Sequence, residues 1–222
     1  MCSSDLANEA FLDTAQIRQN ILSHAKVINY VPSSAQGSKT SLTVTVTPAA
    51  NEDQTVNAIV LDKYSRLLGQ DIDGVNYPFV TLNSNTAYKS GDSFYFPNVE
   101  IKQGEAITIQ YPAFSNNASR RYQIPSPNVD ISTLTVTVQA SKSNTHTEVY
   151  NLSSDITLVT NDSKVFFVEE DDSLNYTIYF GDGVIGKRPV DGNIINVTYL
   201  DTAGSVSNNI SSFIFTDPVA GK

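Results

Sequence analysis

The feature that most constrains the fold is an alternation of apolar and polar residues that recurs along the chain. Over 42–47 the sequence reads Leu-Thr-Val-Thr-Val-Thr, and the pattern returns over 107–111, 134–138 and 176–180. Because successive side chains of a strand point to opposite faces, this period of two predicts sheets with one buried face, as in β-sandwiches.

A helical periodicity precedes the strands. Apolar residues recur at three-, four- and seven-residue spacings, at Phe11, Ala15, Leu22, Ala25 and Ile28. They predict an amphipathic helix over 7–30, which ends where Asn29 can cap it and Pro32 prevents continuation. The apolar stripe is too wide to be left in water and is a candidate assembly face. The predicted fold class is therefore mainly β (α+β), an N-terminal amphipathic helix followed by antiparallel β-sandwich-like domains.

Prolines and turn residues divide the rest of the chain. We expect a first β region over 31–121 and a second over 131–216, which carries a glycine-rich hairpin. Pro125 and Pro127 stiffen 122–130, which we expect to be a linker or crossover, and 217–222 would be a tail. Residues 1–6, MCSSDL, match the translation of a common sequencing adapter. We interpret them as an artefact of a metagenomic fragment and exclude them from the fold.

Composition argues against several function classes. The chain has 23 acidic and 14 basic residues, a net charge of −9 that disfavours nucleic acid as a partner. Its one cysteine, Cys2, provides no disulfide framework. No apolar run approaches the ~20 residues of a membrane helix.

His24 and His146 lack the context of a general base. The acidic run 169–173 lacks the spacing of a calcium loop. We therefore expect no enzyme, cofactor or metal site.

The segment 181–187, GDGVIGK, satisfies two nucleotide-binding templates by spacing alone. Both templates need a helix after the glycines, because its N-terminal amides hold the phosphate. Here Arg188 and Pro189 follow, and then a strand-like run begins at Ile194. We therefore interpret the segment as a hairpin with turns at Asp182-Gly183 and Asp191-Gly192.

The same segment resembles a known family. The runs 176–187, YTIYFGDGVIGK, and 191–195, DGNII, are similar to a hairpin of the baseplate wedge proteins of T-even-type contractile-tailed phages, relatives of the baseplate J family. Further matches at 11–34 and 94–104 occur in the family's order. The motif positions are Phe180, Gly181, Asp182, Gly183, Gly186, Asp191, Gly192 and Asn193.

The resemblance implies an N-terminal or middle portion of a structural subunit, located in the virion tail baseplate and assembled in the host cytoplasm. It also implies a ring-like assembly, with other wedge proteins and further copies of the chain as partners. One alternative is an acidic β-sandwich binding module, an adhesin or glycan-binding domain, which the composition equally allows. The predicted helix, left without its upstream partner, favours the wedge subunit. A nucleotide-dependent enzyme using Gly181 to Lys187 is the third hypothesis.

Overall fold

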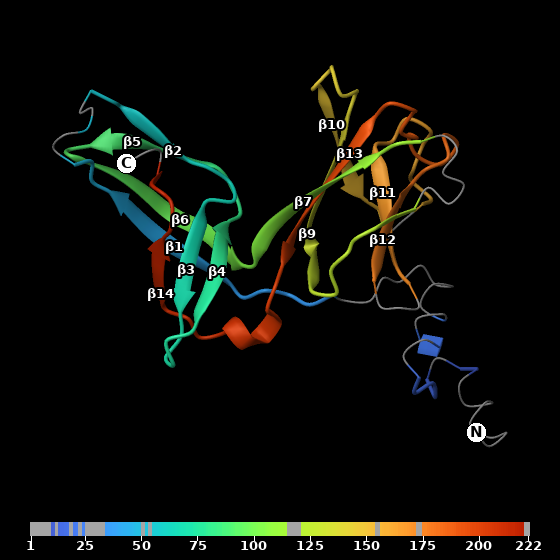
Figure 1. Cartoon of the computed structure of the whole chain (residues 1–222), viewed down its shortest axis with the longest axis horizontal. Coiled ribbons are helices and arrows are strands. Elements are labelled where there is room, and N and C mark those ends of the chain that lie inside the picture. The colour runs from blue at the N-terminus through green and yellow to red at the C-terminus, as the bar shows by residue number, and fades with distance from the viewer. Residues whose placement is uncertain are drawn as a thin grey trace. The chain divides into compact units, whose positions relative to one another are not determined.

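The computed structural model describes residues 10–11, 13–17, 20–21, 24, 34–49, 52, 55–114, 121–153, 156–171 and 175–219. The chain divides into two compact units (Figure 1). Unit 1 comprises Met1–Ser34 and Thr108–Tyr199, and unit 2 comprises Ala35–Ile107 and Leu200–Lys222. Two of the three boundaries, after Ile107 and after Tyr199, fall within strands, and the third follows Ser34. Each unit is therefore built from segments that are distant in sequence.

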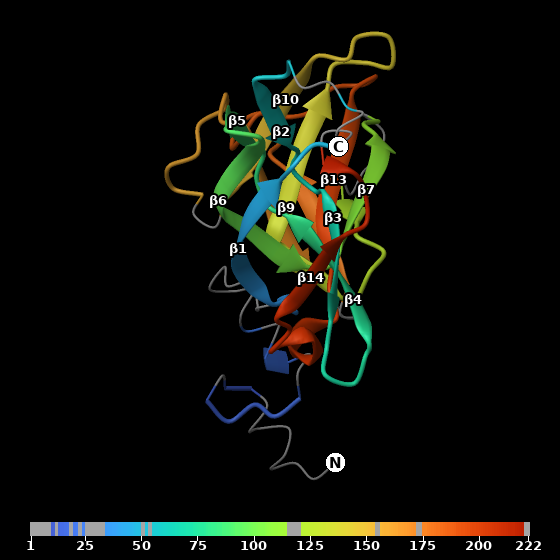
Figure 2. The same ribbon diagram turned by 90° about the vertical axis from the view of Figure 1, so that its left-hand side faces the viewer.

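Unit 2 is built on one sheet. Its strands are β1 (Lys39–Val46), β2 (Ala58–Leu61), β3 (Arg66–Gln70), β4 (Asn76–Thr81), β5 (Asn85–Ser90), β6 (Ser93–Gln103) and β14 (Ser212–Phe215). They follow the order β14-β3-β4-β6-β5-β2, and β1 also pairs with β6. A hairpin joins β3 to β4, with Gln70 opposite Asn76 (Figure 2). Strand β6 therefore organises the sheet, because three strands pair with it.

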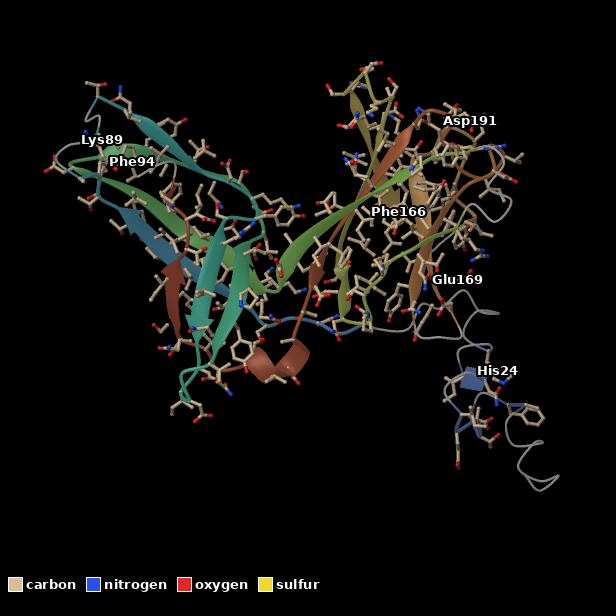
Figure 3. The ribbon with its side chains drawn as sticks, in the orientation of Figure 1. His24, Lys89, Phe94, Phe166, Glu169 and Asp191 are labelled. Atoms are coloured by element: carbon tan, nitrogen blue, oxygen red, sulfur yellow. The ribbon has the colours of Figure 1, made fainter. Side chains whose placement is uncertain are left out.

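The core of unit 2 follows from the alternation. In β1, Val44 is buried while Thr43 and Thr45 are exposed, as the period of two predicts. Residues Phe94, Phe96, Val99 and Ile101 of β6 are buried in the same core cluster (Phe94 in Figure 3). Val219, within the segment expected to be a tail, also belongs to this cluster.

Unit 1 carries the second sheet. Its strands are β7 (Glu105–Pro112), β8 (Arg121–Gln123), β9 (Val129–Gln139), β10 (Thr147–Leu152), β11 (Val165–Glu170), β12 (Tyr176–Phe180) and β13 (Ile194–Asp201). Their order is β7-β13-β9-β10-β11-β12-β8. Residues 124–128, within the expected linker or crossover, connect β8 to β9. Strand β10 pairs antiparallel with β9, as β12 does with β11 and β8. Strands β10 and β11 instead pair in parallel, with Asn151 opposite Val165.

The two edge strands of this sheet meet. Tyr111 of β7 donates a hydrogen bond to the carbonyl oxygen of Gln123 in β8, and its ring lies 5.4 Å from that of Tyr122. The sheet therefore curls until its first and last strands are in contact. Val136, Phe166, Ile178 and Val197 are buried in this unit (Phe166 in Figure 3).

The predicted N-terminal helix is wrong, and the fold class is all β rather than α+β. Within the described residues 10–11 and 13–17 the chain has turns and bends, with Ala15 N donating to Phe11 O at 2.9 Å. Among the residues of 7–30 that the structure describes, Asn20, Ile21 and His24 have helical backbone conformation, and no α-helix is among the elements of the described residues. A single amphipathic helix of this length is marginal unless its apolar face packs, and Phe11 is 64% exposed. The described part also contains no helix able to span a membrane.

Candidate functional site

The candidate site is the connection between β12 and β13, residues 181–193, which we call the glycine loop. Strands β12 and β13 are not neighbours, because β9, β10 and β11 lie between them in the sheet. The predicted hairpin is therefore wrong: the loop is a crossover connection. Sequence could not reveal this, since two strands joined by a short glycine-rich segment pair in most proteins.

Hydrogen bonds give the first half of the glycine loop a defined shape. One side-chain oxygen of Asp182 accepts from Val184 N at 2.8 Å and Ile185 N at 3.0 Å. Gly183 N donates to Gly186 O at 3.1 Å, which closes the turn. The loop is also attached to the segment between β10 and β11, because Gly186 N donates to Thr160 O and Lys187 N donates to Ser163 O.

The glycines have two different roles in this shape. Gly183, Gly186 and Gly192 have φ of 96°, 87° and 88°, a region that favours glycine. At position 181 a glycine is required because the backbone nearby leaves no space for a side chain. An added Cβ there would overlap the carbonyl oxygen of Ile185 and lie 2.6 Å from that of Gly186.

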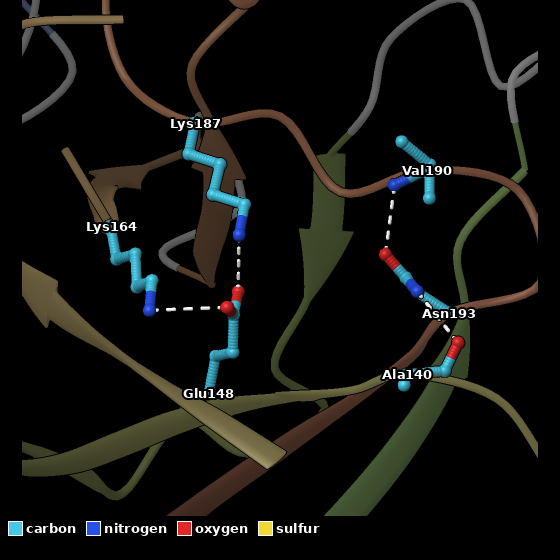
Figure 4. A network of polar contacts seen from close by, with 6 residues as sticks. All are labelled: Ala140, Glu148, Lys164, Lys187, Val190 and Asn193. Atoms are coloured by element: carbon cyan, nitrogen blue, oxygen red, sulfur yellow. Dashed lines mark hydrogen bonds and ion pairs between the residues drawn. The ribbon is translucent and has the colours of Figure 1, made fainter. Parts of the chain in front are cut away.

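Asn193 closes the second half of the loop. Its side-chain oxygen accepts from Val190 N at 2.9 Å, and its amide nitrogen donates to Ala140 O at 2.8 Å (Figure 4). Asp191 and Gly192 form the turn between these contacts. Phe180, at the start of the loop, is buried, and its ring meets those of Tyr122 and Tyr150 at 5.9 and 5.4 Å. The eight motif residues thus shape and anchor one loop.

A charged network lies beside the loop. Glu148 of β10 binds two lysines, with Lys187 Nζ 2.6 Å from one carboxylate oxygen and Lys164 Nζ 3.1 Å from the other (Figure 4). Hydrogen bonds from the two lysines lower the pKa of Glu148, and the one from Lys187 has the larger effect. Burial, together with the charge of Glu148, raises the pKa of Tyr150 to about 12.

The network borders a cavity of about 240 Å³. Its floor is apolar and includes Val138 and Tyr150, both buried, while Val190 lies at its exposed side. His146, Lys187 and Arg188 also line it. Nothing in the sequence indicated this cavity, because Glu148 and Lys187 are 39 positions apart and follow no motif.

The other candidate residues lie elsewhere. Phe11 and Ala15 of the predicted assembly face are in the described N-terminal turns, whereas Leu22, Ala25 and Ile28 lie outside the described residues, as do residues 1–6. Glu169 and Glu170 of the acidic run end β11, which pairs antiparallel with β12. Glu169 forms an ion pair with Arg121 at 2.6 Å. Within the described part, no group of three or more His, Cys, Asp or Glu could hold a metal ion.

The geometry also bears on nucleotide binding. The segment 181–187 leads through residues 188–193 into β13, and no helix begins at its glycines. The amides of Val184, Ile185 and Gly186 are already donated to Asp182 and Thr160. The free amides and helix terminus that cradle a phosphate are therefore missing at this loop.

Comparison with known proteins relates this all-β chain distantly to a baseplate wedge protein. The relative is the baseplate wedge protein gp6 of Enterobacteria phage T4, to which the chain is 24% identical over 226 residues. The match covers 94% of this chain and 32% of the relative, so the chain spans about a third of that protein's length. No protein-family model matches the chain. The motif-based resemblance is thus confirmed at the level of a baseplate-wedge-like sequence.

Proposed function

We propose that the chain is part of a structural subunit of a phage contractile-tail baseplate wedge, acting through protein contacts in a ring-like assembly. The observation that carries the proposal is the similarity to a baseplate wedge protein along 94% of the chain. A match over nearly the whole chain favours an architecture common to the two proteins over a single short motif common to both. Its partners would be other wedge proteins and further copies of itself, and its place would be the virion tail baseplate after assembly in the host cytoplasm.

The fold is consistent with a role in contacts rather than catalysis. Both sheets have dense apolar cores, and the glycine loop is held by main-chain hydrogen bonds. Rigid bodies of this kind bind partners with little ordering cost. A helix without its upstream partner does not favour this function over an adhesin, because the predicted helix is wrong. The similarity to a baseplate wedge protein is what supports the wedge subunit over the adhesin.

Immunogold electron microscopy tests the proposal. Antibodies raised against the recombinant chain should label phage particles at the tail end remote from the capsid. Serum first absorbed with the recombinant chain is the control and should lose this label. Label on bacterial surfaces, with tails unlabelled, would favour the adhesin or glycan-binding module instead.

A further inference from the structure

The charged groups at the cavity beside the glycine loop have a net positive charge, although the chain as a whole is acidic. Glu148, Lys187 and Arg188 line the cavity, and Lys164 binds Glu148 beside it. These four groups carry a net charge of +2. The chain as a whole carries −9. An anionic group approaching the molecule would therefore find a local attraction here, against the repulsion of the remaining surface.

One cation at the cavity is not engaged by the network. Each carboxylate oxygen of Glu148 holds one lysine, so Lys164 and Lys187 are both engaged and Glu148 offsets one of their two charges. Within the described residues, no hydrogen bond or ion pair engages the guanidinium of Arg188, which lines the same cavity. A guanidinium presents several donors in a planar fork that matches a carboxylate.

The size and lining of the cavity restrict what can enter. Its volume of about 240 Å³ is below the ~300–1,000 Å³ typical of small-molecule sites. Val138 and Tyr150 form an apolar floor, and the charged groups lie around it. This combination suits a single side chain that has a short aliphatic stem and an anionic end.

We propose that this cavity binds the carboxylate of a glutamate side chain presented by a partner protein, with Arg188 as its principal cationic contact. The aliphatic stem would lie over Val138 and Tyr150. The cavity is preformed, because Lys187 and Asn193 are each fixed by hydrogen bonds to neighbouring segments. The inference rests on the proposed function, since it assigns one contact surface to a subunit that acts through contacts.

Backbone amide NMR tests this site directly on the recombinant chain. We expect acetyl-Gly-Glu-Gly-amide to bind with a millimolar Kd and to shift the amides of Ala140, His146 and Val190. The glutamine counterpart, acetyl-Gly-Gln-Gly-amide, should bind about tenfold more weakly, because it lacks the charge. Arg188→Gln should weaken binding of the glutamate peptide by a similar factor.

Arg66→Gln provides a matched control, because it removes the same charge from exposed Arg66 in unit 2 and should leave binding unchanged. Equal binding of both peptides, loss of binding in Arg66→Gln, or no shift at the cavity would overturn the proposal. Inorganic phosphate binding at the cavity as tightly as the glutamate peptide would also overturn it, by showing a general anion site. None of these results would alter the immunogold labelling, so the two proposals can fail separately.

Discussion

At the scale of single residues, two glycines of the same loop are required for different reasons. Gly181 lies where a Cβ would overlap the carbonyl oxygen of Ile185, whereas Gly183 has open space around it but a φ of 96°. We expect Gly181→Ala to lower the free energy of unfolding by about 3 kcal/mol, because backbone must move to admit the methyl group. Gly183→Ala should cost only about 1 kcal/mol, the conformational penalty. Urea denaturation of both variants measures the difference, and equal losses would show that Gly181 has room to relax.

At the scale of elements, position within the sheet should determine local stability. Strand β6 pairs with β1, β4 and β5, and its Val99 and Ile101 are fully buried. Among the strands of the described residues, β14 is at the edge of the same sheet and pairs with β3 alone. We expect amides of β6 to exchange hydrogen only through global unfolding and those of β14 much faster, through local opening. Hydrogen exchange followed by mass spectrometry resolves the two segments in one sample. Similar protection of both strands would mean that β14 unfolds only together with the core.

At the scale of the whole molecule, tyrosines with raised pKa values should make stability depend on alkaline pH. Burial raises the pKa of Tyr111, Tyr150 and Tyr179, all in unit 1, and that of Tyr150 reaches about 12 from an ordinary value of 10.0. A raised folded-state pKa contributes stability that is fully present below pH 10 and is lost as pH rises towards 12. Tyr150→Phe keeps the ring contact with Phe180 and removes the ionising group. We expect wild-type stability at neutral pH and a shallower alkaline decline, measured by urea unfolding across this range. An unchanged decline would show that Tyr150 ionises without opening the fold.

The sequence alone determined the strands and much of the loop chemistry. Alternation over 42–47 and 134–138 predicts β1 and β9, because the pleat of a strand is a local property. The sequence also predicts that no helix follows Gly186, and the described residues 187–193 contain none. The apolar periodicity over 7–30 predicts a helix, and that prediction is wrong. Periodicity indicates an apolar face, but it does not show what that face packs on.

Only the tertiary structure decided which strands are neighbours. The parallel pairing of β10 with β11 and the separation of β12 from β13 are properties of the whole sheet. The binding of Lys187 and Lys164 to Glu148 likewise joins residues from separate segments of the chain. Such pairings depend on how whole sheets bury their apolar faces, and local composition does not specify a partner. The cavity beside the glycine loop arises from those same non-local contacts, so it became visible only in the folded chain.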